Sequence, residues 1–290
     1  MRAVQFGVMP PATGRFLSSP DVIGAYARAA EDAGFESIWV FEHAVIPADY
    51  APEYPYNPEG RIGIEDDDLP DPLALLAFLA GVTDRLYLGT GVLILPQRSP
   101  VLCAKESATV DALSGGRLEL GIGVGWLREE AEAVGTSFDD RGARTDEAIE
   151  VMRALWSERE ATFHGKWTTF DRAKSYPKPA RSGGPPIHVG GHSRAAARRA
   201  GRLGDGWFPI GLDQAAFTSR RADMFTAARD ARRDPSAIEI TYGYDPRLDT
   251  IKRYADLGVS RWILAAWAQD LEGAKRVLGD LSENVISKLA

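Results

Sequence analysis

Eight short apolar segments alternate with helical segments along the whole chain of 290 residues. The strand-type segments are Ala3 to Val8, Ser37 to Phe41, Leu86 to Leu95, Leu118 to Val124, Ile187 to Val189, Gly206 to Ile210, Ile238 to Tyr242 and Trp262 to Ala266. They show little polar alternation, which is typical of parallel strands buried on both faces. The pattern predicts an α/β fold, a (β/α)8 TIM barrel, whose functional groups collect at the carboxyl ends of the strands. A doubly wound open sheet is the rival architecture, and the even spread of the units favours the barrel.

Serine or aspartate followed by proline marks the predicted start of four helices. The four pairs are Ser19-Pro20, Asp71-Pro72, Ser99-Pro100 and Asp245-Pro246. The polar side chain can cap the first turn, and proline fits the first helical position. Gly34 and Gly258 stand where helices are expected to stop.

Two long stretches interrupt the alternation, one after the second strand and one after the fourth. Ala44 to Pro70 is rich in proline, tyrosine and acidic residues, and it leaves directly from His43. This stretch carries Tyr50, Tyr54, Tyr56 and the acidic run Glu65 to Asp68. These residues either shape a pocket or form a solvated surface. Ala161 to Pro186 contains a predicted hairpin at Thr162 to Trp167. Loops of this length are often lids or binding loops. We find no interdomain linker and expect one domain over residues 1–290.

The composition is that of a soluble globular protein, with 44% hydrophobic and 26% charged residues. A net charge of -7 argues against nucleic acid or an anionic membrane as the partner. The single cysteine, Cys103, excludes an internal disulfide and a cysteine-based metal cluster. The sequence contains no signal-peptide pattern after Met1 and no apolar stretch near the ~20 residues of a membrane helix. We therefore predict a cytoplasmic protein that acts on a small molecule.

The run Trp39 to His43 places an imidazole at the end of a predicted strand. In a barrel, His43 would face the mouth, where an imidazole can accept, donate or hydrogen-bond a proton near neutral pH. The alternative is a structural histidine that bonds a loop carbonyl. Glu42 is expected to point away from His43, because successive side chains of an extended chain alternate.

The run Ile187 to Ser193 places bare backbone and a hydroxyl before a predicted helix, Arg194 to Leu203. Gly190 and Gly191 let the backbone approach an anion closely, and Ser193 can cap the helix or contact the anion. The helix N-terminus itself favours negative charge. An ordinary strand-to-helix turn is the alternative.

Glycines also occur at two other strand ends. Gly121 to Trp126 lacks the third glycine of a dinucleotide-binding turn, so it is weak evidence for a Rossmann site. Its glycines are better explained as room for a flat ligand, with Trp126 either as a wall or as a packed core residue. In Leu88 to Val92, glycines within an apolar strand mark a bulge or a close approach by another group. The sequence has no HExxH-type cluster and no GxSxG elbow, so we predict neither a metal site nor a serine hydrolase.

In combination, these segments resemble the luciferase-like family of flavin- and deazaflavin-dependent oxidoreductases. The resemblance runs from Val4 to about Phe208 and rests on the order and spacing of its motifs. The motifs are Ser37 to Trp39 with His43, Leu88 to Val92, Pro96 to Pro100, Asp111 to Arg117, Leu120 to Trp126, Arg141, Pro186 to Ser193 and Asp205 to Trp207. The last third of the chain matches only as a barrel-like pattern.

The resemblance implies a flavin-like ring at the barrel mouth, with its phosphate near the Gly190-Gly191 turn. It favours coenzyme F420, with FMN as the alternative cofactor, and it implies a homodimer. A non-proline cis peptide of the family maps onto Gly91-Val92, where it would lean on the middle of the ring. Some sugar-phosphate dehydrogenases of the family carry a glutamate acid where Trp126 stands, so that reaction is not expected. The implied cofactor-binding residues are Glu42, Gly91, Val92, Gly123, Val124, Gly125, Trp126, Gly190, Gly191, His192 and Ser193.

We therefore predict an F420-dependent oxidoreductase that transfers a hydride between the deazaflavin and a small organic substrate. His43 is the predicted catalytic residue, either for proton transfer or for hydrogen bonding of the reacting oxygen or cofactor. Two alternatives stay open. One is an FMN-dependent monooxygenase of the same superfamily, and the other is a barrel that only binds or stores a flavin-like ligand.

Overall fold

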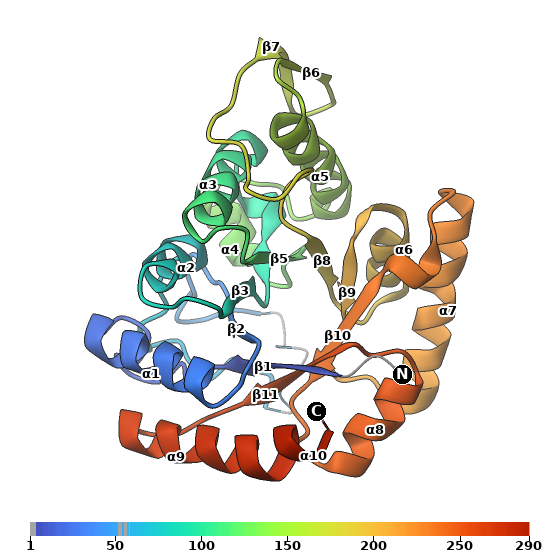
Figure 1. The fold of residues 1–290 in the computed structure, drawn as a ribbon. Coiled ribbons are helices and arrows are strands. Elements are labelled where there is room, and N and C mark those ends of the chain that lie inside the picture. The colour runs from blue at the N-terminus through green and yellow to red at the C-terminus, as the bar shows by residue number, and fades with distance from the viewer. Residues whose placement is uncertain (1–3, 52–53, 55–56, 58, 290) are drawn as a thin grey trace.

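The structure is a computed structural model that describes residues 4–51, 54, 57 and 59–289. Within these residues, parallel strands close into an eight-position barrel that helices surround (Figure 1). The strands are β1 (Gln5–Met9), β2 (Ser37–Val40), β3 (Tyr87–Thr90), β4 (Leu93–Ile94), β5 (Leu118–Gly123), β8 (Ile187–Gly190), β9 (Gly206–Phe208), β10 (Glu239–Gly243) and β11 (Arg261–Ala265). Both β3 and β4 pair with β5, and β1 pairs with β11, which closes the ring. The predicted TIM barrel is confirmed, and the open sheet is excluded.

The helices lie outside the ring of strands. They are α1 (Pro20–Asp32), α2 (Pro72–Ala80), α3 (Pro100–Leu113), α4 (Arg128–Ala133), α5 (Arg141–Ser157), α6 (Arg194–Leu203), α7 (Gln214–Asp230), α8 (Leu248–Asp256), α9 (Leu271–Leu281) and α10 (Ser287–Leu289), with the 3-10 helices η1 (Leu95–Gln97) and η2 (Pro235–Ala237) and the π-helix η3 (Ser282–Ile286). No helix in the described part of the chain has the length and apolarity needed to cross a membrane.

Three of the four predicted helix starts are confirmed. Ser19, Asp71 and Ser99 are the N-cap residues of α1, α2 and α3, each followed by proline. The fourth is wrong by two residues, because α8 begins after Arg247. There, the Asp245 carboxylate accepts a hydrogen bond from the Arg247 N–H at 2.9 Å, so the aspartate fixes a turn before the helix.

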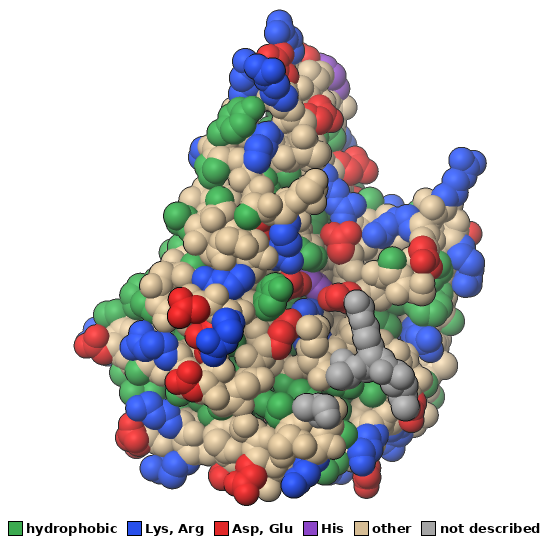
Figure 2. Space-filling model, in the orientation of Figure 1, with side chains coloured by type: hydrophobic (Ala, Val, Ile, Leu, Met, Phe, Trp, Pro, Cys, Tyr) green, Lys and Arg blue, Asp and Glu red, His purple; other side chains and the backbone are tan. Residues whose placement is uncertain are grey.

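Both predicted insertions are present. The second contains an antiparallel hairpin of β6 (Ala161–His164) and β7 (Thr169–Ala173), in which Phe163 pairs with Phe170. The hairpin projects beyond α5 at the top of Figure 1. The surface carries positive and negative side chains interspersed over the face shown in Figure 2.

A small apolar cluster fills the inside of the barrel, separate from the larger core between strands and helices. It consists of Met9, Trp39, Phe208 and Ile263. A Cβ built on Gly89 would lie 2.4 Å from the Trp39 ring, so the glycine makes room for the indole. The close approach predicted for this strand is therefore an internal side chain below the mouth.

Candidate active site

The carboxyl ends of four barrel strands bring predicted site residues together at one mouth. His43 follows β2, and Val92 follows β3. A Cβ built on Gly123, at the end of β5, would lie 2.6 Å from Val92 Cγ2. One built on Gly190, at the end of β8, would lie 2.7 Å from Val92 Cγ1. The ring of His43 packs edge-on against Trp126, with ring centroids 6.1 Å apart. Residues far apart in the sequence thus share one mouth.

Val92 forms a fixed, partly exposed apolar step in this mouth. The Gly91-Val92 peptide bond is cis, as the family resemblance implied. The bare Cα atoms of Gly123 and Gly190 leave the space that the two methyl groups of Val92 fill. Below the step, a Cβ built on Gly91 would lie 3.2 Å from the Phe208 ring. Val92 is therefore packed closely against neighbouring backbone and keeps a partly exposed apolar surface in the mouth.

A buried carboxylate that the sequence analysis did not identify holds His43. Nδ1 of His43 lies 3.0 Å from Oε2 of Glu130, which is in α4. Oε1 of Glu130 accepts a hydrogen bond from the Ala44 N–H at 2.7 Å. The Glu130 side chain is 0% exposed, and that of His43 is 6% exposed. Nε2 of His43 makes no hydrogen bond with any described residue, so it is the ring nitrogen left for a ligand.

An aromatic group lies beside His43. Tyr50 and Tyr54 of the first insertion pack edge-on against Trp126, with centroid distances of 5.5 and 5.2 Å. Nε1 of Trp126 is buried and has no hydrogen-bond partner among the described residues. Tyr56 lies outside the described residues. The tyrosines of this loop therefore help to form a wall of the mouth, together with Trp126.

The acidic run Glu65 to Asp68 of the same loop contacts another loop. Asp67 accepts a hydrogen bond from the Gly14 N–H at 2.6 Å. Asp68 lies 3.7 Å from the guanidinium of Arg15. Gly14 and Arg15 belong to the connection between β1 and α1, so these carboxylates fasten the insertion to its neighbour.

Glu42 is buried, and protein groups occupy its carboxylate. Oε2 accepts a hydrogen bond from the Ile94 N–H at 2.6 Å, and Oε1 accepts one from Nε of Arg98 at 2.8 Å. Arg98 is shared with Asp71. Burial raises the pKa of Glu42, and the Arg98 guanidinium opposes that rise. Glu42 therefore fixes the strand segment that follows Val92.

The turn after β5 is fixed from outside the barrel. Gly125 has φ +79°, a conformation that favours glycine, and Nε of Arg141 donates to its carbonyl at 3.3 Å. A Cβ built on Gly125 would approach Ile94 Cγ2 to 3.0 Å. Val124 is half-buried in the same turn. Trp126 is thus presented to the mouth by a turn with little freedom.

α6 begins at the mouth with the turn Gly190 to Ser193. Gly191 has φ +110°, which disfavours any side chain at this position. Ser193 is the N-cap, and its hydroxyl accepts a hydrogen bond from the Ala196 N–H at 3.1 Å. His192 is half-buried between the two. The first N–H groups of a helix lack partners within the helix, so this end of α6 suits an anion.

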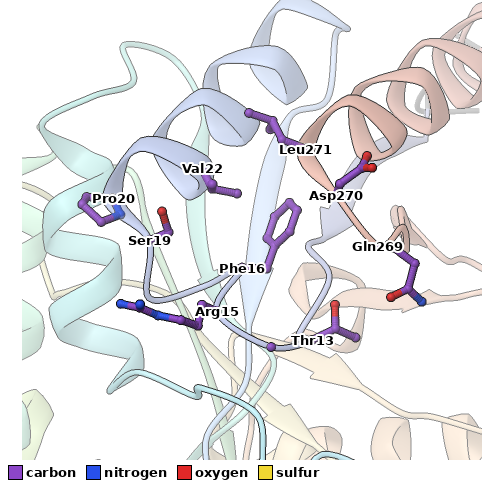
Figure 3. Close-up of a pocket in the computed structure, with 10 residues that line it drawn as sticks. Thr13, Arg15, Phe16, Ser19, Pro20, Val22, Gln269, Asp270 and Leu271 are labelled. Atoms are coloured by element: carbon purple, nitrogen blue, oxygen red, sulfur yellow. The ribbon is translucent and has the colours of Figure 1, made fainter.

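A cavity of about 530 Å³ lies elsewhere on the rim, between the loop after β1 and the loop after β11. Figure 3 shows Phe16, Val22 and Leu271 on its apolar side, with Arg15 and Asp270 around it. None of the predicted site residues lines this cavity.

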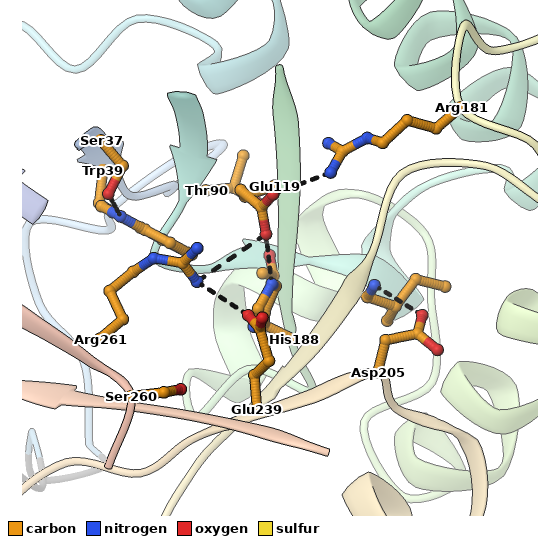
Figure 4. Close-up of polar contacts among 12 residues, drawn as sticks. Ser37, Trp39, Thr90, Glu119, Arg181, His188, Asp205, Glu239, Ser260 and Arg261 are labelled. Carbon is orange, nitrogen blue, oxygen red and sulfur yellow. Dashed lines mark hydrogen bonds and ion pairs between the residues drawn. The ribbon is translucent and has the colours of Figure 1, made fainter. Parts of the chain in front are cut away.

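A second cluster of ionisable groups lies inside the barrel near the amino ends of the strands (Figure 4). Nε2 of His188 lies 2.6 Å from Oε2 of Glu119. Arg181 donates to Oε1 of Glu119 at 2.9 Å. Arg261 lies 3.9 Å from Glu119 and 3.4 Å from Glu239. We call these five residues the floor cluster.

The groups around Glu119 in the floor cluster explain why its pKa is low. Burial by itself would raise the pKa of Glu119, but the bond to His188 and the two guanidinium groups lower it to about 2. Ligand-type atoms of Glu119, His188 and Glu239 lie within 4.8 Å of one another. Guanidinium groups already supply positive charge to these carboxylates, so we interpret the cluster as an internal ion-pair network.

Glu130 is the residue at the mouth that sequence reasoning missed. It stands in the charged run Arg128 to Glu132, which has the composition of a solvated helix face. One signal was available: Leu127 and Ala131 are buried, and helical spacing places Glu130 on their side of the helix. A carboxylate on an apolar face needs a buried hydrogen-bond partner.

Comparisons with known proteins found a matching family model, related sequences and solved structures of similar fold. A family model described as luciferase-like monooxygenase matches residues 4–247. An uncharacterized protein of Mycobacterium tuberculosis is 34% identical over 273 residues, which cover 91% of this chain and 94% of that protein. An F420-dependent glucose-6-phosphate dehydrogenase of Kineococcus radiotolerans is 30% identical over 78% of this chain and 65% of its own length.

An FMNH2-dependent dimethylsulfone monooxygenase of Pseudomonas fluorescens is 34% identical over 64% of this chain and 46% of its own length. Among solved structures, an F420-dependent secondary alcohol dehydrogenase in complex with an F420-acetone adduct has a TM-score of 0.78. The match covers 100% of both chains at 20% identity, so it is a likeness of fold.

Proposed function

The chain belongs to the luciferase-like monooxygenase family, and from that premise we propose that it is an F420-dependent oxidoreductase. It would transfer a hydride between the deazaflavin and a small organic substrate. The observation that carries the proposal is the juxtaposition, at one mouth, of the Val92 step and an imidazole whose Nε2 is left for a ligand. The relative named as F420-dependent also covers more of this chain than the FMNH2-dependent one.

The residues of the mouth fit a planar ring that carries a phosphate. Val92 offers an apolar surface without polar groups to desolvate. Trp126 packs against His43 at the same mouth, and its buried Nε1 has no hydrogen-bond partner among the described residues. The α6 end offers a phosphate the turn at Gly191 and the Ser193 hydroxyl. When bound, the deazaflavin would supply the carbon centre that accepts or donates the hydride.

We assign the following roles to the residues of this chain. His43 exchanges a proton with the reacting oxygen through Nε2, while Gly91 and Val92 buttress the ring. The residues that line the ring are Gly123, Val124, Gly125 and Trp126. The residues that hold the phosphate are Gly190, Gly191, His192 and Ser193. Glu42 acts at one remove, because it fixes Ile94 in the segment after the Val92 step.

Titration of the purified protein with F420 and with FMN tests the cofactor. Quenching of tryptophan fluorescence is a suitable signal, because Trp126 lies in the mouth. We expect saturable micromolar binding of F420 and weaker binding of FMN. Val92→Asp, which puts a carboxylate against the ring, should abolish the F420 signal. Micromolar FMN binding with no F420 binding rejects the cofactor assignment.

An FMN-dependent monooxygenase is the second candidate, and the FMNH2-dependent relative favours it. Its site would use the same mouth. Oxygenation of a substrate in the presence of reduced FMN, oxygen and a separate flavin reductase would support it against the F420 proposal.

We also propose that the protein is a homodimer. Leu102 and Leu113 on α3 are 60% and 67% exposed and offer apolar surface that a second copy of the chain could cover. Light scattering after size exclusion should give twice the chain mass of 31.5 kDa. A mass of one chain contradicts the dimer and leaves the cofactor proposal untouched.

A further inference from the structure

We propose that Glu130 is a positioning residue that fixes the tautomer of His43, so that Nε2 carries a lone pair and accepts the substrate proton. The inference rests on the proposed function for the identity of the reaction. The tautomer itself follows from contacts within this chain and can be tested without any cofactor.

The first step is that both oxygens of the Glu130 carboxylate have hydrogen-bond partners. One oxygen meets Nδ1 of His43 at 3.0 Å, and the other accepts from the Ala44 N–H at 2.7 Å. No lysine or arginine among the described residues forms an ion pair with Glu130, although its side chain is 0% exposed. A buried carboxylate needs strong donors, and here they are the ring of His43 and the next backbone N–H.

The second step is the direction of the hydrogen bond. An ionised carboxylate only accepts hydrogen bonds, so the hydrogen must sit on Nδ1 of His43. In a neutral imidazole, the other nitrogen then has no hydrogen. That nitrogen, Nε2, is the one that makes no hydrogen bond with the described residues. Glu130 and the edge of Trp126 together also fix the plane of the ring.

The third step is the proton balance of the reaction in the oxidising direction. The O–H bond of a substrate alcohol breaks, and its proton goes to Nε2 of His43. The O–H electron pair would form the second bond of the carbonyl as the C–H electron pair leaves with the hydride, for which the bound deazaflavin would be the acceptor. The imidazolium so formed lies 3.0 Å from the Glu130 carboxylate, which stabilises its charge. The proton then passes from Nε2 to water at the mouth.

Nitrogen-15 spectra of the histidine rings in the cofactor-free protein test the tautomer. The chain has four histidines, and His43→Asn identifies the signal of His43 by its loss. We expect the wild-type protein to show hydrogen on Nδ1 of His43. In Glu130→Gln, the amide oxygen can still accept from Ala44, but the amide NH2 then faces Nδ1 and moves the ring hydrogen to Nε2.

Three variants complete the experiment. Glu130→Gln should lower kcat by about 10²-fold or more while KM changes little, since a base is lost and the binding surface is kept. Glu130→Asp keeps a carboxylate and should recover part of kcat and the Nδ1–H signal. Glu132→Gln, on the same helix but 61% exposed, is the matched control and should match the wild type in both readouts.

A wild-type protein with hydrogen on Nε2 of His43 overturns the inference, and so does a Glu130→Gln protein with an unchanged tautomer. If Glu130→Gln does not fold, Glu130→Asp decides: an Nε2–H signal there, where the carboxylate remains, would also overturn it. If the tautomers behave as expected but F420 does not bind, the assignment of Glu130 stands and the proposed function fails.

Discussion

Two histidine–glutamate pairs lie at opposite ends of this barrel, and they differ in burial and in the charges around them. At the mouth, His43 meets Glu130 at 3.0 Å and keeps Nε2 for a ligand. At the floor, His188 is fully buried and meets Glu119 at 2.6 Å, and Glu119 also pairs with the guanidinium groups of Arg181 and Arg261. We propose chemistry for the pair at the mouth alone, because the functional groups of a barrel collect at the carboxyl ends of its strands.

The difference between the two ends also explains their architecture. The mouth is built from loops and glycines, which leave a side chain such as Val92 in a set position with one open face. The floor consists of charged side chains that neutralise one another. The apolar ring of Trp39 packs edge-on against His188, with ring centroids 5.7 Å apart. We expect substitutions at the mouth to change activity and substitutions at the floor to change stability.

The largest effect should come from His43→Asn. The asparagine amide keeps a donor near the Nδ1 position for Glu130 but removes Nε2, so folding should be little affected. We expect turnover to fall by about 10²- to 10⁴-fold. The measurement is F420 reduction with the best substrate from a panel of small alcohols. His188→Gln, which keeps a donor towards Glu119, is the matched control and should change turnover far less. Equal turnover in His43→Asn and wild type would remove His43 from the chemistry.

Glu119→Ala should have the next largest effect, and on stability. The change leaves His188 and two arginines of the floor cluster without their shared carboxylate. We expect the free energy of unfolding to fall by about 3–5 kcal/mol, measured by urea denaturation. The control Glu132→Ala removes an exposed carboxylate 3.8 Å from Arg128 and should stay within about 0.5 kcal/mol of wild type. A similar loss of unfolding free energy in both variants would mean that the floor cluster stabilises the fold no more than an exposed ion pair does.

The pH dependence of the free energy of unfolding should reveal the contribution of Glu119 to stability. The pKa of Glu119 is about 2 in the folded protein, against an ordinary value of 4.5 for a glutamate, so the folded state binds this proton more weakly. Its contribution is therefore present above about pH 4.5 and is lost as the pH falls towards 2. The contribution is about 3 kcal/mol. The stability gap between wild type and Glu119→Gln should narrow over that interval, and a constant gap would contradict the assignment.

The mouth of the barrel could be predicted from the sequence, because its residues belong to short contiguous patterns. Strand ends, proline-flanked caps and the glycines at 123 and 190 are contiguous patterns, and strand parallelism places all carboxyl ends at one mouth. The sequence did not predict either carboxylate partner. Glu130 is 87 residues from His43, and Glu119 is 69 residues from His188. Such pairs depend on side-chain directions that only the closed barrel sets.

Glu119 shows what the sequence can indicate about a buried partner of this kind. It is a lone charge inside the apolar strand Leu118–Gly123, which indicates a buried partner without identifying it. Arg261, at the start of the last strand, leaves the same incomplete signal. A single sequence can therefore reveal that a buried charge needs a partner, while the identity of that partner depends on the register between strands.

The smallest effect concerns the packing of Val92 against Gly123 at the mouth, and it tests whether Val92 is held in one position. Gly123→Ala puts a Cβ 2.6 Å from Val92 Cγ2 and should cost about 1–3 kcal/mol through overpacking. Val92→Ala removes the methyl group that is in the way, since Val92 Cβ would lie 3.7 Å from the new atom. The double variant should therefore be more stable than the sum of the single losses predicts, by about 0.5–3 kcal/mol. Gly279→Ala, a helical site with nothing within 4 Å, is the control and should stabilise slightly. Strict additivity would mean that Val92 is free to move, and the mouth would then have no fixed surface for a ring.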